Sequence, residues 1–320
     1  MKRALVTAVV AVLLLAGTGI RAAQAEDISG TITVTKVIFE NSRLVGDVTC
    51  TMTDGPCIDF GAPNIRLWLN GYTITGAADP DAPPDPLDPT AFCNASSGPP
   101  PADGIRIFNQ VGGQILGPGI VQRFRRHGIL IVGTIGTPTR AKVTLVTSHH
   151  NCFSGLLTNR MSDSVIEEIV SVRNANNSLG APCGGNCLVN SHNNRIRRSV
   201  FGGNGSVLGP AGNNDFGIGL LFGSSGNLVE DNAIAGNTNG ILIQASASGN
   251  VIRRNVIAGN PPGQVSRDYG PDIGFDIRDD SLVAGDGARN TFFRNWCVTY
   301  SGPGPAVCPS LPGPPHGSDD

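Results

Sequence analysis

The chain has 320 residues, of which 43 are Gly, 15% are charged and only 5% are aromatic. An N-terminal leader contains three of its 23 basic residues, so the remainder carries 20 basic against 25 acidic residues. A mildly acidic chain is a poor partner for nucleic acid, because phosphate binding needs clustered Lys and Arg.

The first 25 residues have the pattern of a secretory signal. Lys2 and Arg3 precede an apolar stretch from Ala4 to Ile20, and the small-residue motif Ala23-Gln24-Ala25 follows. This pattern predicts a signal peptide over residues 1–25 and a secreted or periplasmic protein. No later stretch is apolar for long enough to cross a bilayer, so we expect no transmembrane segment after cleavage.

The remainder is predicted to be one β-helix domain over residues 26–300. It opens with an apolar strand segment within residues 28–60 that covers the N-terminal end of the coil. Residues 77–103 contain eight prolines and predict a long loop between the first and second turns of the coil. Residues 301–320 form a Gly- and Pro-rich C-terminal tail.

Two segments in the second half of the chain are copies of each other. The sequence GNLVEDNAIAGNTNG from Gly226 to Gly240 returns 23 residues later as GNVIRRNVIAGNPPG from Gly249 to Gly263. Weaker copies lie on both sides. The asparagines that close the copies are Asn151, Asn174, Asn204, Asn237 and Asn260. A fixed period of this length indicates a solenoid, propeller or array.

Each copy contains runs of three to five residues rich in Val and Ile, separated by Gly and Asn. Runs this short predict strands, since a helix needs ten or more residues at 3.6-residue spacing. Short strands that return every 21 to 33 residues describe the turns, or rungs, of a parallel β-helix. We expect the Asn columns to be structural, because Asn tolerates left-handed corners and can bond its neighbour in the next rung.

These repeats, from about Ile105 to Tyr300, resemble secreted right-handed parallel β-helix proteins with the pectin lyase-like fold. The segment from Asn64 to Gly76 is similar to the first rung of such proteins. The resemblance implies an all-β, single-stranded right-handed solenoid with short rungs. It implies no single function, because the fold includes polysaccharide lyases, glycoside hydrolases, epimerases, copper-site accessory proteins and non-catalytic surface proteins.

Eight cysteines follow the predicted signal peptide, as expected for an oxidising compartment. Short loops favour Cys50 with Cys57, Cys183 with Cys187 and Cys297 with Cys308, which leaves Cys93 with Cys152. The alternative, a metal or redox site, is disfavoured because the chain has no CxxC pair and no Cys and His set at zinc spacing.

A carboxylate patch is the candidate catalytic site. Aligning Gly217, Gly240 and Gly274 as one column places Asp215 and Asp272 two rungs apart, about 9–10 Å, which is near the upper limit for an inverting glycosidase. The same alignment puts Asp276 and Arg278 on one face. If residues 263–266 form the rung instead, this pairing disappears, and turn residues are the alternative explanation.

The sequence contains two candidate metal sites. The acidic cluster Asp272, Asp276, Asp279 and Asp280 overlaps the carboxylate patch and predicts a calcium site there. Its spacing matches no EF-hand loop. His149 and His150 would resemble the copper-site members of the fold. Adjacent residues of a strand point to opposite faces, so surface turn residues are the favoured explanation of this pair.

Charged pairs occupy equivalent places in four copies: Glu167-Glu168, Arg197-Arg198, Glu230-Asp231 and Arg253-Arg254. Their alternating sign predicts ion pairs between rungs, with no need of a ligand.

No complete catalytic signature is visible. The sequence therefore predicts a secreted β-helix protein that binds a polysaccharide, a cell-surface glycan or another surface component. The alternative is a carbohydrate-active enzyme, a polysaccharide lyase or inverting glycoside hydrolase, with a groove lined by the carboxylates named above.

Overall fold

The structure is a computed structural model of the 320-residue chain. It describes residues 25–52, 54–78, 102–175, 184–205, 216–260, 274–281, 289–303, 307 and 308. Nearly all of the predicted signal peptide, most of the Pro-rich loop and most of the C-terminal tail lie outside these residues, so the domain boundaries stay a prediction.

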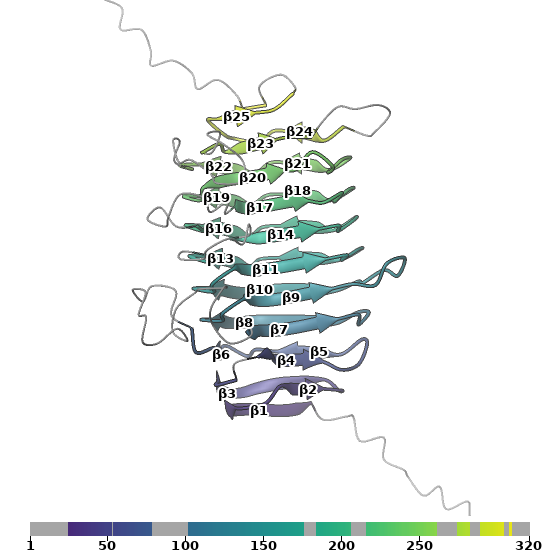
Figure 1. Cartoon of the computed structure of the whole chain (residues 1–320), viewed down its shortest axis with the longest axis vertical. Coiled ribbons are helices and arrows are strands. Elements are labelled where there is room, and N and C mark those ends of the chain that lie inside the picture. Colours follow the sequence, from purple (N-terminus) through teal and green to yellow (C-terminus); the bar gives the residue numbers. More distant parts are fainter. Residues whose placement is uncertain are drawn as a thin grey trace, which may run out of the picture.

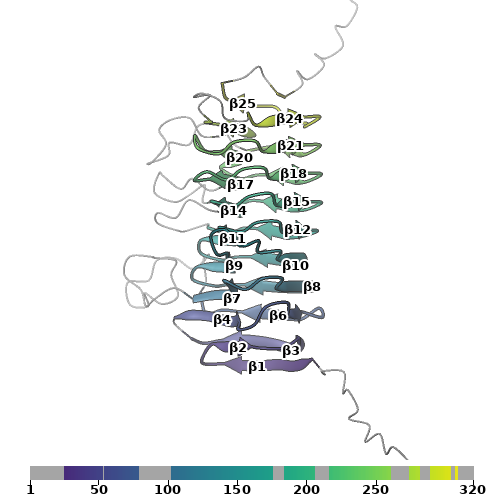
Figure 2. The same ribbon diagram turned by 90° about the vertical axis from the view of Figure 1, so that its right-hand side faces the viewer.

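The described chain winds into a stack of rungs that runs from β1 at one end to β25 at the other (Figure 1). Two sheets form opposite walls of the stack, and their described strands pair in parallel (Figure 2). The larger sheet contains β1 (Glu26–Ile32), β3 (Ser42–Cys50), β5 (Arg66–Trp68), β6 (Thr73–Thr75), β8 (Gln114–Gln122), β10 (Lys142–His149), β12 (Val165–Glu167), β13 (Val170–Val172), β15 (Arg195–Arg197), β16 (Val200–Gly202), β18 (Leu228–Glu230), β19 (Ala233–Ala235), β21 (Val251–Arg253), β22 (Val256–Ala258) and β24 (Thr291–Phe293). The smaller sheet contains β2 (Lys36–Ile38), β4 (Gly55–Phe60), β7 (Ala102–Phe108), β9 (His127–Val132), β11 (Ser154–Asn159), β14 (Asn186–Val189), β17 (Phe216–Leu221), β20 (Asn239–Ile243), β23 (Ile277–Asp279) and β25 (Tyr300–Ser301). The expected parallel β-helix is confirmed.

Alternate residues of each strand point into the coil and stack in columns. Ile166, Ile196, Val229 and Ile252 form one such column, and each is fully buried. Side chains alternate between the two faces of a strand, so three-residue strands with one central aliphatic residue are enough to build a continuous core. The Val and Ile runs of the repeats form this core.

Asparagine ladders hold the corners between the strands. One ladder contains Asn151, Asn174, Asn204, Asn237 and Asn260. After the first member, each Oδ1 accepts hydrogen bonds from the backbone N–H and from the Nδ2 of the asparagine one rung before it. All five side chains are buried. The predicted structural role of this column is confirmed.

A column of glycines lies next to this ladder at the start of the smaller sheet. A Cβ at Gly155 would stand 2.0 Å from Oγ of Ser171 and 2.8 Å from Nδ2 of Asn174. Any side chain would therefore displace the ladder, which explains why a Gly precedes each aliphatic run.

Two of the predicted disulfides, Cys50–Cys57 and Cys297–Cys308, are confirmed. Cys152 and Cys187 are disulfide-bonded as well. Their predicted partners, Cys93 and Cys183, lie outside the described residues, so these two pairings stay predictions. None of the helices that a membrane span would require occurs in the described residues.

Candidate functional site

The longest connections between strands occur at the same corner of successive rungs. Residues 79–101, 176–183, 206–215 and 261–273 are all inserted between a strand of the larger sheet and the next strand of the smaller sheet. The flanking strands are β6 and β7, β13 and β14, β16 and β17, and β22 and β23. We call this the insertion corner. In repeat proteins, insertions that gather on one side of the stack commonly mark the binding side.

Basic side chains collect at the insertion corner over three consecutive rungs. Arg123 is exposed after β8, His149 and His150 lie at the end of β10, and exposed Arg173 follows β13. Parallel pairing puts Arg123, His150 and Arg173 in one column. These three have left-handed φ angles of 60°, 52° and 52°. We call Arg123, His149, His150 and Arg173 the basic cluster.

The two histidines of the cluster face each other. Their Nδ1 atoms lie 2.6 Å apart, and the rings meet edge to face at 4.8 Å. The expectation that they point to opposite faces is wrong, because the left-handed backbone at His150 ends the alternation of the strand. Burial lowers the pKa of His149, and His150, Arg123 and Arg173 lower it further by their positive charge.

A buried polar column lies close by, at the start of three strands of the smaller sheet. Oδ1 of Asp103 accepts the backbone N–H of His127 at 3.3 Å, and Nδ1 of His127 lies 2.5 Å from Oγ of Ser154. Burial raises the pKa of Asp103 to about 6, against the opposing effect of Arg126. Burial also holds the pKa of His127 well below its usual value. Because all three side chains are at most 4% exposed, the column braces the corner and does not face solvent.

The predicted catalytic alignment was wrong at its last step. Ile241 pairs with Ile277, which places Asp276 beside Gly240 in the glycine column, two residues later than expected. Asp276 is 2% exposed and accepts hydrogen bonds from Nδ2 of Asn260 and from the backbone N–H groups of Val298 and Thr299. The hydrogen bonds of the Asp276 carboxylate thus connect its own rung to the rungs before and after it. Asp215 and Asp272 lie outside the described residues, so a role for them stays a prediction.

The other predicted site residues make local contacts. Nε of Arg278 donates to Asp280 at 2.9 Å, and Asp279 accepts the backbone N–H of Ser281 at 3.0 Å. Burial raises the pKa of Asp279. Within the described residues, no three His, Cys, Asp or Glu side chains come together as a metal site would require. The calcium prediction includes Asp272, which is outside that set, and remains a prediction.

The predicted ion pairs between rungs are confirmed. Glu167 contacts Arg197 and Arg198 of the next rung at 2.7 and 2.8 Å. Glu230 contacts Arg253 and Arg254 at the same two distances. Both glutamates are almost fully buried by their partners. The arginines thus satisfy these carboxylates within the chain.

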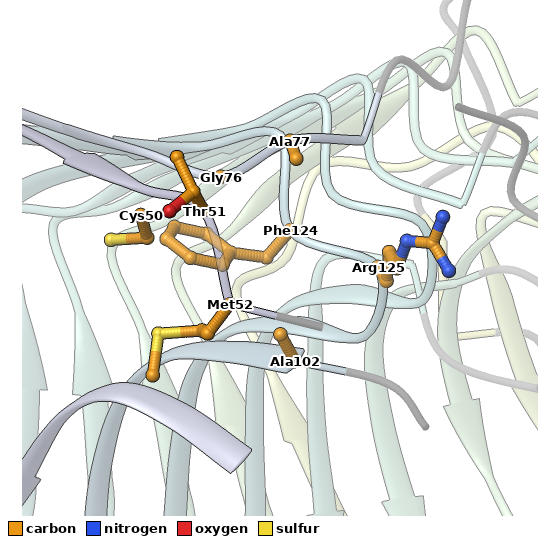
Figure 3. A pocket seen from close by; sticks show the side chains of 8 residues that line it. All are labelled: Cys50, Thr51, Met52, Gly76, Ala77, Ala102, Phe124 and Arg125. Atoms are coloured by element: carbon orange, nitrogen blue, oxygen red, sulfur yellow. The ribbon is translucent and has the colours of Figure 1, made fainter. Parts of the chain in front are cut away.

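A small pocket of about 170 Å³ is lined by residues at the end of β3, after β6, at the start of β7 and after β8 (Figure 3). The ring of Phe124 and the sulfur atoms of Cys50 and Met52 line it, and the guanidinium of Arg125 points away from those sulfur atoms. Among the described residues, the lining includes no carboxylate and no imidazole.

The model of a family described as periplasmic copper-binding protein NosD matches residues 102–296, more than half of the chain. This chain belongs to the NosD family. A search of curated proteins finds no match to this NosD-family chain.

Solved structures similar to this member of the NosD family are sugar-acid enzymes of low sequence identity. The A-modules of the mannuronan C-5 epimerases AlgE4 and AlgE6 from Azotobacter vinelandii share 11% and 14% identity with it, with TM-scores of 0.43 and 0.46. The matches cover 88% and 91% of this chain and 92% of each module. A polygalacturonase from Erwinia carotovora ssp. carotovora shares 12% identity over 88% of this chain and 100% of that one, with a TM-score of 0.44. The β-helix that the sequence resemblance implied is confirmed by the parallel strand pairings and by the match to the NosD family.

The described residues do not fit the copper ion in the name of the NosD family. Copper prefers imidazole, thiolate and thioether ligands. The described cysteines are all disulfide-bonded, and Met161 is fully buried in the core. Met52 lines the small pocket, where the described lining residues include no imidazole beside its sulfur atom. His149 and His150 are the one facing imidazole pair described, and the positive charges of Arg123 and Arg173 beside them disfavour a cation.

Proposed function

We propose that this exported protein binds an acidic polysaccharide at the basic cluster, without converting it chemically. The observation that carries the proposal is the column of Arg123, His150 and Arg173 at the insertion corner. A carboxylate is the natural partner of this column, because Arg binds carboxylates in two-pronged, charge-assisted hydrogen bonds.

The rung spacing supports a polymer over a single small anion. Successive rungs lie about 4.8 Å apart, so Arg123 and Arg173, two rungs apart, are about 10 Å apart along the stack. A chain with regularly spaced carboxylates can contact both arginines at once, which strengthens binding by raising the effective concentration of the second contact. An uronic-acid polysaccharide has that chemistry.

Location in the cell envelope supports the same proposal. The NosD family is described as periplasmic, and residues 1–25 carry the pattern of a secretory signal. Envelope and extracellular spaces are where acidic polysaccharides occur as polymers and as matrix.

The test is the affinity of the mature protein for oligouronates, measured by isothermal titration calorimetry, with neutral dextran of equal length as the comparison ligand. The double variant Arg123→Gln and Arg173→Gln removes two charges from the column. Each lost charged contact costs about 1.5–3 kcal/mol, so we expect the affinity to fall at least tenfold per arginine.

Arg140→Gln with Arg160→Gln is the matched control. These arginines are also exposed and also have left-handed φ angles, 50° and 56°, but they lie at the opposite corner of the coil, where the smaller sheet passes to the larger one. The control should bind like the unmodified protein. Equal losses in both double variants, or equal binding of dextran, would contradict the proposal.

A further inference from the structure

The outer face of the short strands β13, β16, β19 and β22 is apolar and exposed. Its central column runs through Val170, Val200, Ala233, Val256 and Trp296, one residue per rung. Val200, Val256 and Trp296 are 43%, 52% and 44% exposed. The neighbouring column adds Val172, Gly202, Ala235 and Ala258, so the face carries small, uncharged side chains across its width. Apolar patches that continue over several elements mark interaction surfaces.

A column of charges runs along one side of this face. Glu168, Arg198, Asp231 and Arg254 occupy the same left-handed corner of four successive rungs and alternate in sign. Within the chain Arg198 pairs with Glu168 and Arg254 pairs with Asp231. The four side chains nevertheless remain 38–46% exposed, which leaves them free to contact a further surface.

We propose that this face packs against the same face of a second copy of the chain, with the two coils antiparallel. A two-fold axis in the interface, perpendicular to the coils, reverses the order of the charge column. The order minus, plus, minus, plus becomes plus, minus, plus, minus. Each charge therefore meets its opposite, with Glu168 facing Arg254 of the second copy and Arg198 facing Asp231 of the second copy.

The same axis also matches the apolar columns. Val170 of one copy lies opposite Val256 of the other, and Val200 lies opposite Ala233. Trp296 then covers Thr147, the residue at the equivalent position one rung before Val170. A two-fold axis parallel to the coils would instead place the charge columns on opposite sides of the interface. Self-complementarity of one patch is what a two-fold dimer requires, and it favours a second copy over an unrelated partner.

The interface is small. From Thr147 to Trp296 it spans five rung steps, about 24 Å. A face of this length on strands of three residues is smaller than a standard protein interface, so we expect a weak dimer that dissociates in the micromolar range or above. The dissociation constant can be measured by sedimentation velocity of the mature protein. At concentrations up to about 1 mM, a Kd of 1 mM is still detectable.

Val256→Glu places an unpaired charge in the central column of the face, opposite Val170 of the second copy, on a side chain that is already half exposed. We expect the dissociation constant to rise at least tenfold. Ile135→Glu, at a site that is 76% exposed in the turn between β9 and β10, is the control and should leave it unchanged. The proposal would be overturned if the protein is monomeric at every concentration, or if Val256→Glu leaves the dissociation constant of the dimer unchanged.

Charge exchange tests the antiparallel register separately from folding. Glu168→Arg breaks one ion pair inside the chain, and Arg254→Glu breaks two, with Asp231 and with Glu230. Each change alone should weaken the dimer. Combined, they still break all three internal pairs but restore opposite charges across the two-fold axis, so dimerisation should recover. Additive losses in the double variant would rule out this register. Oligouronate binding by the monomeric Val256→Glu variant should persist, since it depends on the basic cluster.

Discussion

The Nδ2 of Asn204 donates to Oδ1 of Asn237 at 2.8 Å, and Asn174 donates in the same way to Asn204 at 3.1 Å. Each amide is thus a donor to one rung and an acceptor for another.

Asn204→Ala should be strongly destabilising. The change leaves the buried N–H of Asn174 and the carbonyl of Ser171 without their partner, and each unsatisfied group costs about 1–3 kcal/mol. Urea unfolding checks this, with Asn190→Gly as the control, because Asn190 is exposed, lies outside the ladders and has a left-handed φ of 47° that Gly adopts without strain. A loss below about 0.5 kcal/mol would argue against ladders as the main support of the corners.

Asn186→Leu should stabilise the protein. Asn186 occupies an inward column between Leu156 and Ile218, is fully buried, and neither its Oδ1 nor its Nδ2 has a partner. Replacing an unsatisfied amide by an aliphatic group of similar volume should raise the free energy of unfolding by about 1–3 kcal/mol.

Thr158→Val is the matched control for that change. Thr158 is also a buried inward polar residue, but its hydroxyl donates to the carbonyl of Cys187 at 3.1 Å. Its replacement should not stabilise the fold. If Asn186→Leu lowers the unfolding midpoint, a bound water that satisfies the amide is the simplest reason.

Asp103 should make stability depend on pH. Its pKa in the folded protein, about 6, is above the unfolded value, so the folded state holds a proton that the unfolded state releases between about pH 4 and 6. Stability therefore falls as the pH rises through this window, and the full loss, about 2–3 kcal/mol, is present above pH 6. His127 acts in the opposite direction, since its lowered pKa causes stability to be lost as the pH falls below about 6.5.

Asp103→Asn separates the two effects. The stability of this variant relative to the unmodified protein should increase by about 2–3 kcal/mol between pH 4 and pH 7, measured as the shift in urea midpoint at each pH. An increase that is absent, or that has the opposite sign, would mean that Arg126 and the His127 N–H outweigh burial at this carboxyl.

Binding without turnover is the expected result for polysaccharides. We expect the mature protein to leave uronans and neutral glycans uncleaved, with or without calcium, as read by reducing-end release and absorbance of unsaturated products. Turnover that disappears in Asp215→Asn and in Asp272→Asn would establish the catalytic alternative. Turnover that survives both changes would exclude those carboxylates.

The fold was predictable because a β-helix repeats its environment. Each rung bonds mainly to its two neighbours, so the same Asn, Gly and aliphatic positions recur at the same place in the chain, as from Asn227 to Asn250. Interior columns, the asparagine ladder and the rung-to-rung ion pairs are all consequences of that one period.

The site was less predictable because its parts are joined by insertions of unequal length. The insertion at residues 261–273 hid the true pairing of Ile241 with Ile277. The predicted alignment of Gly274 with Gly240, which had put Asp272 in one column with Asp215, failed with it. Arg123 and Arg173 are 50 residues apart in the sequence, and only their rung positions bring them together with His150.

The amino-acid sequence by itself determined the coil, its core and its corners, since these depend on contacts between neighbouring rungs that are encoded in the local repeat. Tertiary structure alone decided where charge gathers. A left-handed residue at His150 turns one ring onto its neighbour, and the register between rungs decides which arginines share a column. Backbone torsion and register act across rungs, so no single repeat reveals them.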